Sequence, residues 1–155
     1  MKTTRSSAYI KLSPQRVRSL FRLALTGLWG WFALKFFLTE GQPAVLVASG
    51  VCLLTGVVAA IVVFLSDLSF VAHAPERDID EYQLQQRNRA YLATLRYGCS
   101  NLALAWIART VAGPRAFVSA PVLDNFILVL FLTLLIAPAG FLATRLIEDE
   151  NTSDT

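Results

Sequence analysis

The sequence is poor in charge, cysteine and histidine, and each shortage excludes a class of function. Charged residues make up 16% of the 155 residues and apolar residues 55%, a balance outside the range of water-soluble domains. A single histidine gives no metal-ligand spacing, and the chain has no CxxC pair, no glycine-rich phosphate loop and no serine-histidine-aspartate set. We therefore expect no catalytic, metal or cofactor site and no enzymatic activity.

The two cysteines, Cys52 and Cys99, both fall in apolar stretches rather than in loops. Disulfide frameworks place cysteines where an oxidising compartment reaches them, so we expect two free thiols within helix packing. The net charge of +3 does not indicate nucleic acid as a partner, because lysine and arginine near membrane ends are the ordinary topological signal.

Long uncharged runs dominate what is present. Residues 44–65 are 22 consecutive residues without a charge, and residues 125–144 are likewise uncharged. An α-helix rises about 1.5 Å per residue and the hydrocarbon core of a bilayer is about 30 Å thick, so each run can cross it. Two further apolar stretches lie between basic residues, Arg22 with Lys35 and Arg96 with Arg109.

These runs predict an all-α membrane protein whose four transmembrane helices form two hairpins. The predicted spans cover residues 17–38, 43–65, 90–112 and 122–144. Ser13-Pro14 predicts a helix start, with Ser13 as the N-cap. Asp78 and Glu81 have capping-box spacing, so the third helix should begin near Ile79 and extend from the cytoplasm into its span.

The remaining segments flank this four-helix domain of residues 14–144. Residues 1–13 are basic, residues 66–89 form a polar loop, and residues 145–155 form an acidic tail that we expect to be frayed. The positive-inside rule places both termini and the polar loop in the cytoplasm, in a multi-pass protein of the cell inner membrane. That side then holds 11 of the 14 basic residues: Lys2, Arg5, Lys11, Arg16, Arg18, Arg22, Arg77, Arg87, Arg89, Arg96 and Arg145.

Polar residues within the spans are candidate pairing residues, because hydrocarbon makes an unpaired polar group costly. Arg96 and Asn101 lie inside the third span, and we expect Asn101 to hydrogen-bond across helices. Arg109 and Asp124 should lie at similar depth near the outer surface, where an ion pair would clamp the second hairpin.

Small residues recur every four positions along the second span. Ala48, Cys52, Gly56 and Ala60 therefore share one helix face. Small residues at this spacing let two helix backbones approach closely in lipid, so we interpret the face as a helix-packing surface.

The densest polar stretch lies between residues 73 and 91. One interpretation is a metal-assisted site built from His73 and the four carboxylates between residues 76 and 81. The favoured interpretation is a solvated helix start, because acidic residues suit the positive N-terminus of a helix. Arg87 and Arg89 further along would meet anionic lipid headgroups.

The stretch from Asp78 to Arg89 resembles a segment of uncharacterised small bacterial inner-membrane proteins. Those proteins carry an acidic DERE-like cluster before a long helix that enters the membrane. The resemblance covers about a dozen residues, and this chain has Asp-Glu-Tyr-Gln where those proteins often have Asp-Glu-Arg-Glu. It implies a four-span inner-membrane protein and assigns no role to any residue.

We therefore expect a non-enzymatic accessory subunit or small membrane regulator that acts by helix packing and by a cytoplasmic docking loop. Its partners would be the lipid bilayer and either another membrane protein or further copies of itself. The alternative is a small transporter or channel subunit that uses Arg96, Asn101 or the Arg109–Asp124 region. The small multidrug resistance transporters are excluded as a model, because their first helix carries a glutamate and this chain has no acid before Glu40.

Overall fold

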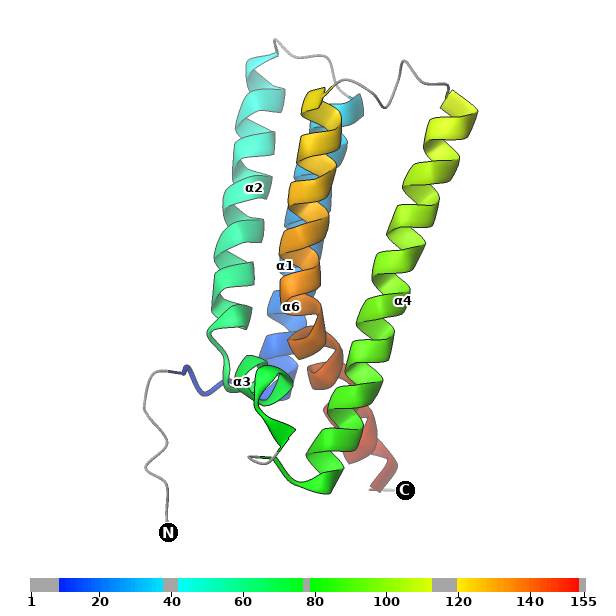
Figure 1. The fold of residues 1–155 in the computed structure, drawn as a ribbon. Helices are drawn as coiled ribbons and strands as arrows, with labels where there is room; N and C mark the ends of the chain where they lie inside the picture. Colours follow the sequence, from blue (N-terminus) through cyan, green and yellow to red (C-terminus); the bar gives the residue numbers. More distant parts are fainter. Residues whose placement is uncertain (1–8, 38–41, 77–78, 113–119, 154–155) are drawn as a thin grey trace.

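The computed structural model describes residues 9–37, 42–76, 79–112 and 120–153, and these residues fold as α-helices without a β-strand. The axes of four long helices lie roughly side by side, and a short helix crosses one end of this bundle (Figure 1). The helices are α1 (Pro14–Phe37), α2 (Pro43–Phe64), α3 (Asp67–His73), α4 (Glu81–Ala112) and α6 (Ala120–Ser153).

Two of the described helices are long and apolar enough to cross a membrane. They are α2 and the part of α6 from Val122 to Asp149. The other two long helices carry more charge, with Arg16, Arg18, Arg22 and Lys35 in α1 and several arginines in α4. Composition and length therefore support two of the four predicted spans.

The predicted helix starts are confirmed for α1 and α2. The backbone N–H of Arg16 donates to Oγ of Ser13 at 3.4 Å, the N-cap bond expected for a helix beginning at Pro14. α2 begins at Pro43, where the missing N–H and fixed φ of proline suit the first helical position.

α4 begins two residues later than predicted. Its start is at Glu81, and the carboxylate Oδ1 of Asp80 accepts from the backbone N–H of Gln83 at 2.7 Å. Asp80 and Gln83 have the same capping-box spacing as Asp78 and Glu81, so this spacing alone does not fix where the helix begins. Asp78 lies outside the described residues.

The predicted polar loop of residues 66–89 contains the helix α3. Ser66 is fully buried and its Oγ accepts from the backbone N–H of Ser69 at 3.4 Å, which caps α3. Ile10 adds to this corner by donating to the carbonyl of Leu65 at 2.9 Å and accepting from Asp67 at 3.2 Å. These bonds fix the N-terminal segment beside the junction of α2 and α3.

α6 also extends beyond the predicted end of its span at residue 144, and it continues to Ser153. The guanidinium of Arg145 pairs with Glu148 at 2.9 Å, one turn along the helix. The carboxylate of Asp149 accepts from the hydroxyl of Tyr82 at 2.7 Å. Contacts with the start of α4 thus hold a segment that the sequence predicted to be frayed.

Close backbone contact holds α1 against α2, which run in opposite directions (Figure 1). A Cβ atom added at Gly27 would lie 2.7 Å from the Cα of Gly56, so neither position has room for a side chain. The same applies where the ring of Phe21 covers Gly140 of α6. α4 packs mainly on α6, where the side chain of Leu134 lies against Gly98.

We predict that Gly27→Ala destabilises the bundle by about 1–3 kcal/mol, because the new methyl group overlaps the backbone of α2. Gly50→Ala is the matched control, since a Cβ there meets nothing within 4 Å. Thermal unfolding of both variants in the same detergent measures the difference. Equal stability of the two variants would contradict the proposed backbone contact.

Candidate functional site

A chain of hydrogen bonds connects three helices at the centre of the bundle. The indole Nε1–H of Trp29 donates to the hydroxyl of Tyr97 at 2.7 Å, and that hydroxyl donates to Oγ1 of Thr133 at 3.3 Å. Thr133 in turn donates to the carbonyl of Leu130 at 3.0 Å. The chain therefore joins α1, α4 and α6 through one tyrosine.

Each polar group of this hydrogen-bond chain has a partner within the protein. Trp29 donates one bond, and Tyr97 both accepts and donates one. Thr133 is fully buried and donates to a carbonyl of its own helix. Polar groups that are paired in this way stabilise a core and are not available to bind a ligand. Sequence reasoning missed this connection because it assigned Trp29 and Tyr97 no partner, and they are 68 residues apart.

The four candidate pairing residues do not form a common site. Asn101 donates from Nδ2 to the carbonyl of Tyr97 at 2.9 Å, a bond within α4 and not the expected bond across helices. Arg109 and Asp124 are both exposed, and in the described part of the chain no ion pair joins them. Sequence spacing sets the depth of a residue along a helix, but it leaves open the direction in which the side chain points.

Arg96 is exposed on α4, and it has no ion pair with any residue that the structure describes. It precedes Tyr97, so its Cα lies at the level of the central hydrogen-bond chain while its side chain is on the outside of the bundle.

The small residues of α2 are placed unequally. Gly56 and Ala60 are buried against α1 and α6, and Cys52 is half-buried with its Sγ 3.8 Å from a Cβ placed at Gly30. Ala48 is exposed. The close contact of α1 and α2 thus involves the middle and the α3 end of this face.

Arg87 joins α4 to the segment after α3. Its Nη1 donates to the carbonyl of Ala74 at 2.6 Å, and its Nη2 pairs with the carboxylate of Glu76 at 3.3 Å. The side chain is nearly buried, although Glu76 is exposed. Arginine suits this position because its fork of donors reaches two acceptors at once.

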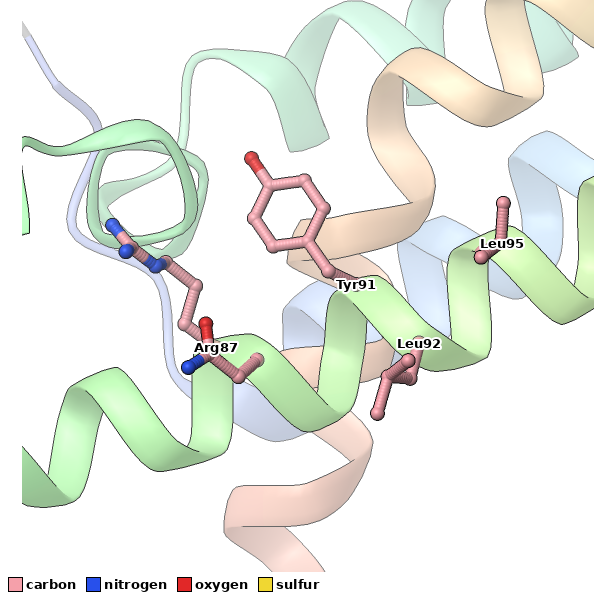
Figure 2. A pocket seen from close by; sticks show the side chains of 5 residues that line it. Arg87, Tyr91, Leu92 and Leu95 are labelled. Atoms are coloured by element: carbon pink, nitrogen blue, oxygen red, sulfur yellow. The ribbon is translucent and has the colours of Figure 1, made fainter.

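A shallow groove on α4 lies beside this clamp and is lined by Arg87, Asn88, Tyr91, Leu92 and Leu95. Figure 2 shows Arg87 and Tyr91 reaching toward α3, whereas Leu92 points away from both. The hydroxyl of Tyr91 donates to the carbonyl of Ala72 at 3.1 Å. The polar ends of Arg87 and Tyr91 thus hold the end of α3 and the residues after it against α4.

The residues suggested for a metal-assisted site have separate structural roles. Nδ1 of His73 bonds to the carbonyl of Ser69 at 2.8 Å, Glu76 pairs with Arg87, and Asp80 caps α4. No group of three histidine, cysteine or acidic side chains that could hold a metal ion occurs among the described residues. Both cysteines are free thiols, but the prediction that both lie in helix packing is wrong for Cys99, which is exposed, whereas Cys52 is half-buried.

Comparison with protein-family models, curated proteins and solved structures finds no match to this chain.

Asp149 joins the end of α6 to the start of α4. Its carboxylate accepts from the hydroxyl of Tyr82 and from the amide of Gln86. The hydrogen bond to Asp149 raises the pKa of the Tyr82 phenol above its ordinary value of 10.0, and partial desolvation and the negative charge of Asp149 act in the same direction.

We predict that Asp149→Asn lowers the pKa of Tyr82 back toward 10.0, because the charged acceptor is lost. The folded pKa is the higher one, so the Tyr82 bond stabilises the protein below pH 10.0 and this stabilisation disappears as the pH rises through the raised pKa. Phenolate absorbance, with a Tyr82→Phe variant subtracted, measures the shift. Glu148→Gln is the matched control and should leave the pKa unchanged.

We predict that Tyr97→Phe destabilises the bundle by about 1–3 kcal/mol, because it leaves the indole N–H of Trp29 without an acceptor. Unfolding in detergent measures this loss. Tyr9→Phe is the control, since Tyr9 is exposed and contacts Phe70 through its ring. A loss of similar size in the control variant would contradict a specific role for the central chain.

Proposed function

We propose that this chain is a polytopic inner-membrane protein without catalytic activity that acts by associating with another membrane protein, as an accessory subunit or small regulator. All four long helices cross the bilayer as two hairpins, and both termini lie in the cytoplasm. We also propose that the chain is related to the small bacterial inner-membrane proteins that its segment from Asp78 to Arg89 resembles.

The exposure pattern of α2 carries the membrane part of this proposal. Most of its large apolar side chains face outward, with Leu46 70% and Leu54 67% exposed, whereas most of its buried residues are small, among them Ser49, Gly56 and Ala60. Only 22% of its apolar window is buried, which supports a helix whose outer face contacts lipid. Large apolar residues outside and small residues inside are typical of a helix surrounded by lipid.

Packing and charge support the insertion of α1 and α4 beside it. α1 is fixed to α2 by the Gly27 contact and to α6 by Phe21, so it cannot leave the bilayer alone if these two helices are inserted. Most of the basic residues of α1 lie in its first three turns, near the end of the bundle that also holds α3. That end is the one the positive-inside rule assigns to the cytoplasm.

Association, not catalysis, is the use that fits the polar residues. The groups able to do chemistry near α3, which are His73, Glu76, Asp80 and Arg87, are engaged in bonds that shape the fold. α4 by contrast presents an exposed outer surface that includes Leu102, Leu104 and Trp106. An exposed helix next to a compact three-helix core is available for a partner.

We predict that the full chain stays in the membrane pellet after alkaline carbonate extraction. Single cysteines, introduced after replacing Cys52 and Cys99 by serine, then test the orientation with a maleimide that does not cross membranes. Lys11→Cys and Gln42→Cys are suitable, because both positions are exposed and lie at opposite ends of α1. Gln42→Cys should react from outside the cell and Lys11→Cys only in inverted vesicles.

Recovery of the chain in the carbonate supernatant would reject the membrane proposal. Reaction of both cysteines from the same side would reject the hairpin of α1 and α2 as a membrane-crossing unit.

A further inference from the structure

Arg96 lies at the level of the middle of α2. The centre of the 22-residue helix α2 falls between Leu53 and Leu54. Because Gly27 touches Gly56 and α1 runs antiparallel to α2, Trp29 is level with Leu54. Trp29 bonds to Tyr97, the neighbour of Arg96, so the backbone of Arg96 lies within about one turn of this level.

The side chain of Arg96 is on the outer face of α4. Leu92, Cys99 and Ala103 are also exposed, and their spacing of three to seven residues from Arg96 places them on the same face. Bonds to the rest of the bundle come instead from Tyr97, and Gly98 packs on Leu134. The arginine thus points away from the three helices that could shield it.

Extension toward the membrane surface does not solve the problem of burying this charge. Side chains of α4 tilt toward its N-terminus, and an arginine reaches about 6 Å in that direction. Half of α2 is about 16 Å long, so the guanidinium stays well inside the hydrocarbon layer if α2 spans it. This level is deeper than the predicted span of residues 90–112 gives for Arg96, which the positive-inside count placed on the cytoplasmic side. A charge at this depth is normally paired or faces a watery cavity.

Among the described residues, no carboxylate can reach that depth. The sequence contains no acidic residue between Glu81 and Asp124, and none in the runs 44–65 and 125–144. Asp124 lies in the first turns of α6, at the end of the bundle away from α3. The other described acids lie near the α3 end. A second copy of the chain, in either orientation, therefore places its described acids near the membrane surfaces.

We propose that the outer face of α4 around Arg96 is the docking surface for a transmembrane helix of a different protein, and that this helix carries a carboxylate near the middle of the bilayer. The inference rests on the proposed function and adds the chemistry of the partner. An ion pair between Arg96 and this carboxylate removes an uncompensated charge from hydrocarbon on both sides of the contact. Leu92 and Ala103 supply packing on either side of the pair.

Binding of a synthetic helix to the full chain in phosphatidylcholine vesicles tests this inference. The probe is a labelled leucine-alanine transmembrane helix with one aspartate at its centre, and the reference probe has leucine at that position. Energy transfer from the labelled chain to the probe reports binding. We expect the aspartate helix to bind about tenfold more tightly than the leucine helix, the range of one strong polar contact between helices.

Substitutions at two arginines show whether the preference depends on Arg96. Arg96→Leu should abolish it and Arg96→Lys should retain part of it, because lysine keeps the charge. Arg109→Leu is the matched control and should leave it unchanged, since Arg109 is exposed near the far end of α4.

Three results would overturn the inference. Equal binding of both helices to the unaltered chain rejects the carboxylate partner. Energy transfer between copies of the chain that Arg96→Leu abolishes assigns the face to a second copy. Anion flux through the vesicles that Arg96→Leu abolishes assigns Arg96 to a water-filled path. Flotation of the vesicles separates these results from failure of the proposed function, because a chain that does not float with lipid is not inserted.

Discussion

The contact between Gly27 and Gly56 sets the geometry on which the rest of the bundle depends. With no side chain on either residue, α1 and α2 approach until their backbones touch. This contact fixes which residues of α1 face α6, so that Phe21 covers Gly140 and Trp29 reaches Tyr97. Close packing of this kind is a main source of stability for helices that lie in lipid, where burying apolar side chains away from hydrocarbon gives little gain.

α4 is held differently from the other long helices. At the α3 end it is fixed by polar contacts, the clamp of Arg87 on Ala74 and Glu76 and the bonds of Tyr82 and Gln86 to Asp149. At its middle it depends on the hydroxyl of Tyr97. Beyond Asn101 its large apolar side chains are mostly exposed. α4 is therefore held at the α3 end and at its middle, and it is uncovered beyond Asn101.

Several elements could be predicted because local chemistry determines them. The N-cap at Ser13, the start at Pro43 and the long apolar runs each depend on neighbouring residues, and the structure has helices at these places. Local rules do not fix a helix start where two residues can serve as the cap, as Asp78 and Asp80 can for α4. They also missed α3 and the extension of α6, because Ile10 and Tyr82 stabilise these segments from distant parts of the sequence.

The sequence by itself determined the helical class, the uncharged runs of residues 44–65 and 125–144 and the absence of acidic residues between Glu81 and Asp124, because these follow from composition and order alone. Only the tertiary structure decided that Tyr97 faces Trp29 and Thr133 while Arg96 faces outward. Neighbouring residues on a helix point about 100° apart, so one becomes core and the next becomes surface according to where the other helices pack.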